Sequence, residues 1–359
     1  MRVGEKVIKE GIQKLIDGRD LTYEESREIM KEIMYGEATS AQIAGFLTAL
    51  RMKGEAVDEI TAFAEVMKEH SHRIHPRVNG RLVDTCGTGG DKIKTFNIST
   101  TAAFVVAGAG VAVAKHGNRS VTSKSGSADI LERLGLNLDM EPKAVEKAVE
   151  QVGIGFMFAP AFHPAMRYAI GPRKELGIRT VFNVLGPLVN PAAANAQLLG
   201  VHDHKLVEPL SHALKRLGCE EAMVVHGLDG LDEISTIGKT VISWLKENEV
   251  TTIETVPKDF GVRLSRPEDL RGTTPDESAE ITFRILNGHC GINDPKTEIV
   301  LVNAATGIIV GGEAEDFSYG MKLARESIES GAAYKKVKSL VKTSNGDLSK
   351  LEELELKYG

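Results

Sequence analysis

Residues 81–117 read RLVDTCGTGGDKIKTFNISTTAAFVVAGAGVAVAKHG. The apolar stretches at 81–83 and 111–114 predict two short strands, and the small residues at 99–108 between them predict a helix. A strand, a helix and a strand in this order indicate a parallel sheet in which the helix makes the crossover. Ligands of such sheets bind beyond the carboxyl ends of the strands, and the glycines of this segment lie there.

The alternation of strands and helices continues beyond this segment. Further strands are predicted at 154–159, 197–201, 222–225 and 299–302, and further helices at 129–135, 142–152, 205–218 and 276–287. We therefore expect an α/β domain over residues 80–359, with a mostly parallel central sheet covered by helices. The charged tail at 338–359 predicts a peripheral helix.

Residues 1–72 carry helical patterns only. Capping boxes at Thr22 and Thr39 begin two helices that follow an apolar first helix, and a fourth is expected from about 57 to 70. These predict a small helical domain hinged to the α/β domain. A proline-containing segment near 165–190, around a helical stretch at 173–183, is expected to return to this helical domain.

Composition narrows the class of protein. The chain has 359 residues, a formal net charge of −6 and 42% hydrophobic residues, as expected for a globular protein of two domains. The negative balance argues against binding to nucleic acid or anionic membranes. The three cysteines lack disulfide or zinc spacing, and no apolar stretch resembles a signal peptide or a membrane span. A soluble, cytoplasmic protein is expected.

The glycine loop, which we define as residues 87–91, reads Gly-Thr-Gly-Gly-Asp. Closely spaced glycines let backbone N–H groups converge on an anion without interference from Cβ atoms. The helix that begins near Asn97–Thr100 adds N–H groups that favour phosphate. The loop alone fits a plain strand-to-helix turn equally well, and it is neither a Walker A nor a G-x-G-x-x-G motif.

A basic segment follows the second strand at 115–123. Lys115 and Arg119 bring positive charge there, while the neighbouring serines and glycines supply hydroxyl and N–H donors. This composition suits a polyanionic ligand. The alternative is an exposed basic loop, and His116 taken alone would be structural.

Two acids, Asp232 and Glu233, follow another predicted strand. Adjacent carboxylates repel each other unless a cation joins them, and ligands that are all oxygen favour Mg²⁺ over zinc. A solvated turn is the alternative. Arg173 and Arg179 lie in the segment GPRKELGIRT, where a guanidinium could bind a carboxylate; the alternative is a salt bridge on a helix surface.

Together these motifs resemble those of the anthranilate phosphoribosyltransferases. The matching stretches, in family order, are GTGGD at 87–91, NIST at 97–100, KHGNRSVTS at 115–123, SKSGSADILERLG at 123–135, RKELGIRTVFNVLGPLVNP at 173–191 and GLDEIS at 230–235. The resemblance implies transfer of the phosphoribosyl group of 5-phosphoribosyl 1-diphosphate to the amine of anthranilate, the second step from chorismate to tryptophan. It also implies a homodimer formed through the helical domain.

The resemblance also implies the residues of the site, with no dedicated acid or base. The residues expected to bind the donor are Gly87, Gly90, Asp91, Thr95, Asn97, Ile98, Ser99, Thr100, Lys115, His116, Gly117, Asn118, Arg119, Ser120, Val121, Thr122, Ser123 and Ser127. Gly87, Asn118 and Arg173 are expected at anthranilate. Ser99, Asp232 and Glu233 are expected to hold Mg²⁺, with two ions per monomer.

Two other functions remain possible at this point. A pyrimidine nucleoside phosphorylase shares the two-domain plan, but its basic, glycine-rich nucleoside and phosphate motifs are not found here. The other is a catalytically silent relative that binds nucleic acid, and the negative charge and the lack of a long basic run speak against it.

Overall fold

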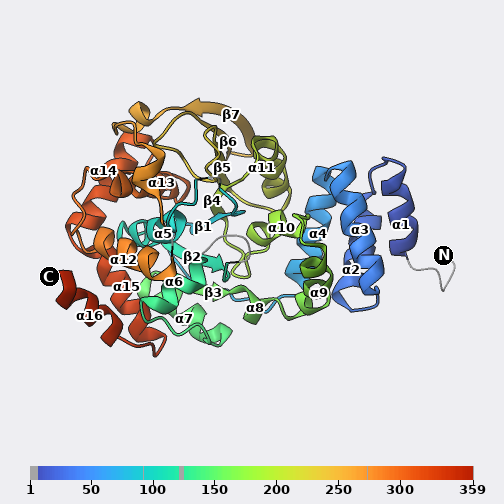
Figure 1. The fold of residues 1–359 in the computed structure, drawn as a ribbon, viewed down its shortest axis with the longest axis horizontal. Helices are drawn as coiled ribbons and strands as arrows, with labels where there is room; N and C mark the ends of the chain where they lie inside the picture. Colours follow the sequence, from blue (N-terminus) through green and yellow to red (C-terminus); the bar gives the residue numbers. More distant parts are fainter. Residues whose placement is uncertain (1–6, 92, 121–124, 273, 359) are drawn as a thin grey trace.

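The computed structural model describes residues 7–91, 93–120, 125–272 and 274–358 of the chain. A helical bundle lies at one end of the molecule and a larger α/β part at the other (Figure 1). The bundle consists of α1 (Val7–Ile16), α2 (Tyr23–Met34), α3 (Ser40–Lys53) and α4 (Val57–Glu69). Both predicted capping boxes form, with Thr22 pairing with Glu25 and Thr39 with Gln42.

One seven-stranded sheet forms the centre of the α/β part. The strands are β1 (Leu82–Gly87), β2 (Ala112–Gly117), β3 (Ile154–Phe158), β4 (Ala196–Gly200), β5 (Glu221–Gly227), β6 (Thr240–Lys246) and β7 (Glu249–Thr255). Their order is β3-β2-β1-β4-β5-β6-β7, in which β1 to β5 are parallel while β6 and β7 are antiparallel. The mostly parallel sheet predicted from the sequence is therefore confirmed, and the carboxyl ends of five strands meet at one edge.

Helices cover both faces of this sheet. Those in contact with strands are α5 (Ile98–Gly108), α7 (Pro142–Val152), α11 (Val207–Arg216), α13 (Pro295–Val310) and α15 (Ala332–Thr343). Further helices pack against other helices: α6 (Ser127–Arg133), α12 (Pro275–Leu286), α14 (Phe317–Glu329) and α16 (Ser349–Tyr358). Alternate residues of β4 enter two different apolar clusters: Leu198 packs in the cluster of α5 and α13, and Leu199 in that of α11. The cluster that contains Leu199 also includes residues of the helical bundle. This shared apolar core joins the bundle to one face of the sheet.

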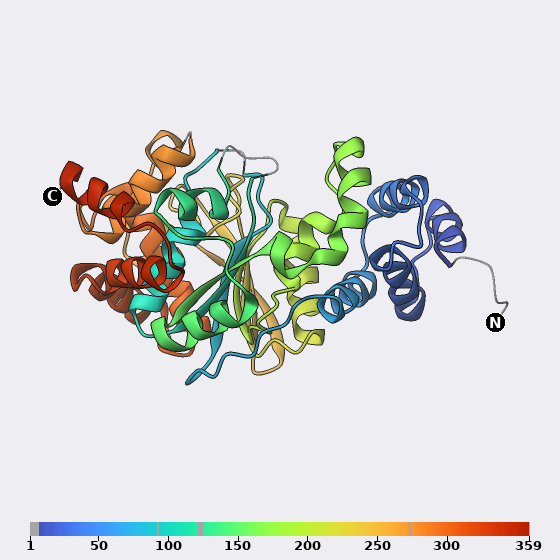
Figure 2. The same ribbon diagram turned by 90° about the horizontal axis from the view of Figure 1, so that it is seen from below.

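The chain returns to the bundle after β3. It does so through α8 (Ala159–Phe162), α9 (Arg167–Leu176) and α10 (Phe182–Leu188), with α9 packed on α2 and α3 and α10 on α4. Figure 2 shows this crossing segment between the bundle and the sheet. The expected single helix at 173–183 is wrong, because Gly177 with φ 62° ends α9 before α10 begins.

Two other predictions of secondary structure are corrected, and one element was missed. The strand expected at 299–302 is part of α13, where burial on every side removes the helical periodicity that would have identified it. The hairpin of β6 and β7 was not predicted; Glu247 and Asn248, with φ 51° and 62°, form its turn. The tail contains the end of α15 and all of α16 instead of one helix, and Leu351 is buried.

Four short 3₁₀ helices complete the description: η1 (Pro164–Met166), η2 (His204–Leu206), η3 (Pro257–Phe260) and η4 (Pro267–Leu270). Among the described residues, none of the helices has the length and apolar character needed to cross a membrane.

Candidate active site

A cleft of about 310 Å³ opens at the carboxyl ends of the parallel strands. Every predicted site residue that the structure describes lines it: Gly87, Gly90, Asp91, Thr95, Asn97, Ile98, Ser99, Thr100, Lys115, His116, Gly117, Asn118, Arg119, Ser120, Ser127, Arg173, Asp232 and Glu233. The remaining three, Val121, Thr122 and Ser123, lie outside the described residues. Segments far apart in sequence therefore meet in one cavity of a size typical for small-molecule sites.

The glycine loop is held from two sides. The Gly89 N–H donates to Asp232 Oδ2 at 2.8 Å, and the Thr88 N–H donates to the Gly200 carbonyl at 2.9 Å. Gly89 and Gly90 have φ 68° and 93°, in the left-handed region that favours glycine. At the far end of the loop, Asp91 Oδ2 accepts the Thr95 N–H at 2.8 Å. The loop is thereby shaped before any ligand binds.

The acid pair, Asp232 and Glu233, is buried at the base of the cleft. Burial raises the pKa of Asp232 to about 6, helped by the nearby charge of Asp91. Burial, followed by the charge of Asp232, raises the pKa of Glu233 well above its usual range. Within the described residues, no lysine, arginine or histidine nitrogen lies within ion-pair distance of either carboxylate. The charges of Arg179 and Lys115 act on the two carboxylates only from beyond ion-pair distance, so a bound cation would fit between them as a direct partner.

The donor set around the acid pair fits Mg²⁺. Glu233 Oε1 accepts the Ser99 N–H at 3.1 Å, which brings the start of α5 and the Ser99 hydroxyl to the acids. Among the described residues, no three acids, histidines or cysteines form a closed cage for a metal. Mg²⁺ usually takes one or two carboxylates and completes its shell with water and substrate phosphate, so this open oxygen set is suitable.

Lys115 is not part of an exposed loop, as one reading of the sequence allowed. It lies at the end of β2, is buried, and its Nζ donates to the Thr85 carbonyl. Burial lowers its pKa, while the nearby carboxylate of Asp84 opposes this effect. The positive charge of Lys115 therefore lies at the base of the cleft, where it acts on the carboxylate of Glu233.

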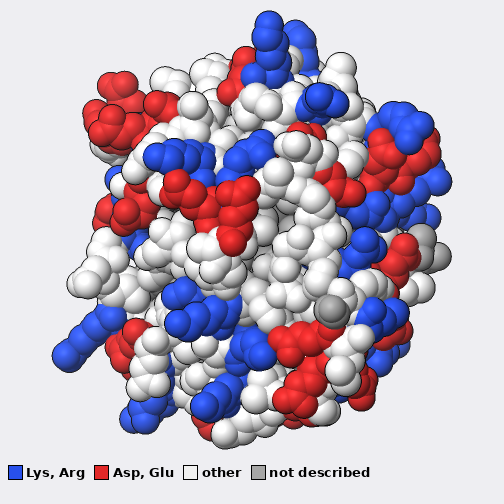
Figure 3. Space-filling view, turned by 90° about the vertical axis from the view of Figure 1, so that its left-hand side faces the viewer, with Lys and Arg blue, Asp and Glu red and all other residues white. Residues whose placement is uncertain are grey.

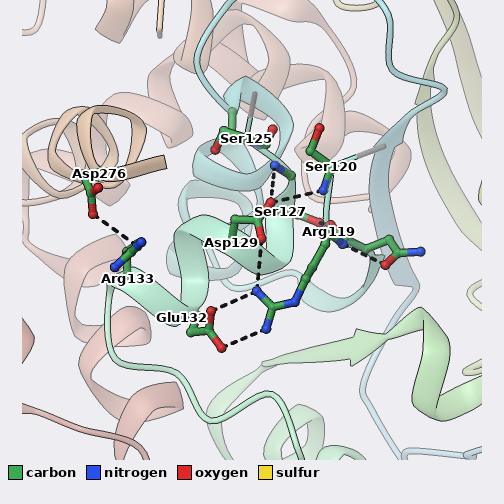
Figure 4. A network of polar contacts seen from close by, with 11 residues as sticks. Arg119, Ser120, Ser125, Ser127, Asp129, Glu132, Arg133 and Asp276 are labelled. Carbon is green, nitrogen blue, oxygen red and sulfur yellow. Dashed lines mark hydrogen bonds and ion pairs between the residues drawn. The ribbon is translucent and has the colours of Figure 1, made fainter. Parts of the chain in front are cut away.

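A carboxylate that the sequence analysis missed, Asp129, accepts hydrogen bonds from the described backbone on both sides of residues 121–124 (Figure 4). Its Oδ2 accepts the Ser120 N–H at 3.1 Å and the Gly126 N–H at 2.9 Å. Arg119 contacts its Oδ1 at 3.1 Å and also pairs with Glu132 at 2.9 Å. The only local signal was an aspartate in the first turn of α6, which many helices carry for capping alone.

The opposite wall of the cleft carries Arg173 on α9. Its guanidinium lies over the Phe182 ring at 5.1 Å from the ring centre, and burial lowers its pKa. Within the described part of the chain, no carboxylate lies at ion-pair distance from it, so the alternative of a surface salt bridge is not formed. Asn118, at the end of β2, also lines the cleft. A planar cation and an amide thus face the space where a small carboxylate could bind.

Two buried histidines lie behind the cleft. The rings of His116 and His163 are 5.0 Å apart, and His116 Nδ1 contacts the Gly186 carbonyl at 3.2 Å. Burial lowers the pKa of His116 to about 3 and that of His163 to about 4. Both are therefore neutral near pH 7 and are not proton donors there.

The depressed pKa of His163 predicts a loss of stability in acid. Below about pH 6.5 the His163 side chain is protonated in the unfolded chain, whereas in the folded protein it stays neutral down to its pKa of about 4. The free energy of unfolding therefore falls as the pH is lowered from 6.5 to about 4. Relative to wild type, His163→Gln should therefore gain about 2 kcal/mol when the pH is lowered from 7.5 to 5.0. Urea unfolding of both proteins at the two pH values measures this. If the free energies of unfolding of wild type and His163→Gln differ by the same amount at both pH values, the low pKa of His163 is contradicted.

The comparisons with known proteins follow the same division of the chain. The chain matches the glycosyl transferase family, helical bundle domain, over residues 9–71, and the glycosyl transferase family, a/b domain, over residues 79–334. It is 50% identical over 343 residues to an anthranilate phosphoribosyltransferase of Acetivibrio thermocellus, with 96% of this chain and 98% of the relative covered. A second such enzyme, of Desulfosudis oleivorans, is 51% identical over 337 residues, with 93% and 98% covered.

Solved structures give the same result. The anthranilate phosphoribosyltransferase of Thermus thermophilus superimposes with a TM-score of 0.87 at 40% identity, covering 93% of this chain and 99% of that one. The enzyme of Saccharomyces cerevisiae in complex with PRPP and Mg superimposes with a TM-score of 0.86 at 29% identity, covering 95% and 99%. A further structure of that enzyme, with 4-fluoroanthranilate, has a TM-score of 0.84 at 28% identity and covers 94% and 98%.

Proposed function

This chain belongs to the anthranilate phosphoribosyltransferases of the glycosyl transferase family, and we propose that its cleft performs their reaction with the residues identified above. The enzyme is a pentosyltransferase of tryptophan biosynthesis. It transfers the phosphoribosyl group of 5-phosphoribosyl 1-diphosphate to the amine of anthranilate, giving N-(5-phosphoribosyl)anthranilate and diphosphate. The observation that carries this proposal is the buried acid pair, which forms no ion pair within the described residues and is hydrogen-bonded to both the glycine loop and the start of α5.

The donor binds at the carboxyl ends of β1 and β2. The glycine loop and the N–H groups at the start of α5 receive its diphosphate, because both present backbone donors in a glycine-rich concavity. Asp232, Glu233 and Ser99 hold Mg²⁺, two ions in each monomer, as a titration of bound metal against protein would test. When bound, the metal supplies charge neutralisation for the leaving diphosphate.

The acceptor binds on the side of α9. Arg173 receives the carboxylate of anthranilate, and Asn118 and Gly87 border its ring. The amine nitrogen bonds to the anomeric carbon as the bond from that carbon to the diphosphate oxygen breaks, and the electron pair leaves with the diphosphate. An aromatic amine is already neutral near pH 7, so it needs no base before attack and loses its proton afterwards. The protein's contribution is orientation and exclusion of water.

The other functions considered from the sequence are not favoured. A nucleoside phosphorylase needs no metal-bound diphosphate, whereas the acid pair here lies where a diphosphate's metal would bind. On the face formed by the C-terminal helices, lysines and arginines alternate with acids instead of forming one basic surface (Figure 3). A binder of nucleic acid would need a basic surface that extends along the ligand.

A turnover assay tests the proposal. The protein is mixed with anthranilate, 5-phosphoribosyl 1-diphosphate and Mg²⁺, and the fluorescence of anthranilate is followed. We expect a loss of fluorescence that needs all three components. Persisting fluorescence, together with cleavage of uridine or thymidine in a parallel mixture with phosphate, would instead support the phosphorylase.

Arg173→Ala is expected to raise the KM for anthranilate about 10- to 100-fold, because it removes a charge-assisted hydrogen bond worth roughly 1.5–3 kcal/mol. The KM for the donor should change less than about twofold, since the donor binds on the opposite wall of the cleft. Steady-state kinetics with each substrate varied in turn measures both values. The exposed neighbour Lys174 provides the control Lys174→Ala. An unchanged anthranilate KM in Arg173→Ala would remove that residue from the acceptor site.

Three wider assignments complete the proposal. The helical domain of residues 1–72, with the returning segment near 165–190, moves as one unit against the rest of residues 80–359. The protein is a homodimer through this bundle, where Ile16 and Met52 are large apolar side chains left 65% and 84% exposed. Light scattering of wild type and of Met52→Lys tests the dimer: a monomeric wild type would contradict it.

The protein works in the cytoplasm, as its three free cysteines suggest.

A further inference from the structure

Arg179 connects the crossing segment to the glycine loop. It lies in the turn between α9 and α10, and its Nη2 donates to the Gly89 carbonyl at 2.8 Å. The guanidinium also lies directly against Gly90, where a Cβ atom would come within 2.5 Å of the arginine Cζ. The two segments are therefore in close contact, although they come from opposite walls of the cleft.

The guanidinium of Arg179 lies in the field of the Asp232 carboxylate but forms no direct ion pair within the described residues. Of the described residues, only Gly89 provides it with a hydrogen-bond acceptor, and no carboxylate lies within ion-pair distance. Its Nη1 is buried without a partner among those residues. A buried donor that lacks a partner is unusual and calls for an explanation. A guanidinium with an unfilled donor, beside a loop that receives diphosphate, supplies one, because the bound anion would attract it.

The other end of the same segment carries the acceptor side of the cleft. Arg173 lies on α9, which packs on α2 and α3, and α10 packs on α4. A shift of the turn at Arg179 towards the glycine loop therefore moves the helix that presents Arg173. The contact at Gly89 is the point where the donor side and the acceptor side meet.

We propose that Arg179 is a positioning residue that couples the two substrate sites, so that diphosphate bound at the glycine loop tightens the binding of anthranilate at Arg173. The inference rests on the proposed function. Coupling of this kind is reciprocal: anthranilate would tighten the binding of diphosphate by the same factor. It would also favour attack of anthranilate on the donor over attack of water on the donor, because the acceptor site is completed when the donor is in place.

Titration calorimetry measures this coupling without turnover. Anthranilate is titrated into the protein alone and into the protein saturated with Mg²⁺ and inorganic diphosphate, which lacks the ribose needed for reaction. For wild type we expect the Kd of anthranilate to fall about tenfold in the presence of diphosphate. In Arg179→Gln the two Kd values should agree within about twofold, while the Kd without diphosphate stays within about threefold of wild type.

Two further variants sharpen the test. Lys174→Gln removes an exposed charge from the same segment and should keep the wild-type coupling. Arg179→Lys keeps the charge but loses the planar fork that reaches Gly89, so its coupling should be at least about threefold weaker than that of wild type. This variant decides the question if Arg179→Gln does not fold.

Retained tenfold coupling in Arg179→Gln, wild-type coupling in Arg179→Lys or absent coupling in wild type would each overturn the inference. The turnover of each preparation is measured in parallel. Wild type that forms N-(5-phosphoribosyl)anthranilate without coupling contradicts the role of Arg179 alone. Wild type that forms no product contradicts the proposed function itself.

Discussion

Replacing Asp232 by Asn and Glu233 by Gln together is expected to lower kcat/KM by about 10³-fold at moderate Mg²⁺. Both carboxylates are buried, and their hydrogen bonds to the Gly89 and Ser99 N–H groups can be kept by amide oxygens. The change therefore removes the negative charge that would hold the metal while leaving the backbone contacts possible. The Mg²⁺ concentration needed for half-maximal rate should rise together with the loss of activity.

The stability of this double variant separates a metal site from a structural turn. Two buried carboxylates that form no direct ion pair within the described residues destabilise the metal-free protein, so their neutral forms should leave the melting temperature unchanged or raise it. The matched control is Glu352→Gln with Glu353→Gln, an adjacent acid pair exposed on α16. Wild-type activity in the Asp232 and Glu233 variant, or an unaltered Mg²⁺ profile, would show that the acid pair holds no metal.

Gly200→Ala is expected to lower the free energy of unfolding by about 3 kcal/mol and kcat/KM by about 100-fold. Gly200 ends β4, and a Cβ atom there would overlap the carbonyl oxygen of Asp232 and come within 2.6 Å of its carbonyl carbon. These are backbone atoms, which cannot turn away as a side chain could. The segment that carries the acid pair must therefore shift from its place beside the glycine loop.

A second glycine provides the comparison for that variant. Gly171 is exposed on α9, and a Cβ atom there would meet nothing within 4 Å. Gly171→Ala should change the free energy of unfolding by no more than about 1 kcal/mol, because the added Cβ meets only its chain neighbours, of which Pro172 offsets the helix preference of alanine. Urea unfolding and steady-state kinetics of both variants measure the effects. Equal behaviour of the two variants would contradict the tight packing of Gly200 against Asp232.

The parts of the fold that could be predicted are those with local signals. The strand before the glycine loop, the capping boxes at Thr22 and Thr39, and the helices after them follow from short-range patterns. The helix α13 did not follow, since a helix that is apolar on every side loses its period. The hairpin of β6 and β7 was missed because its turn, Glu247–Asn248, lacks the glycine that usually marks such turns.

The site divides in the same way. The glycine loop, the basic segment and the acid pair are contiguous motifs, and the structure gathers their described residues around one cleft. Gly200, Asp129 and the contact of Arg179 with Gly89 could not be found in this way. Each depends on a neighbour brought close only by the folded chain: Gly200 on Asp232, and Asp129 on the N–H groups of Ser120 and Gly126. A glycine at a strand's carboxyl end was the one signal available for Gly200.

Quantifying both products of one reaction mixture tests the proposed reaction most directly. The purified protein is incubated with 5-phosphoribosyl 1-diphosphate and anthranilate, with Mg²⁺ and, separately, with the metal removed by a chelator. N-(5-phosphoribosyl)anthranilate and diphosphate are then measured together. We expect equal amounts of the two with Mg²⁺, and neither with the chelator. Diphosphate released without N-(5-phosphoribosyl)anthranilate, or no consumption of either substrate, would contradict transfer in this cleft.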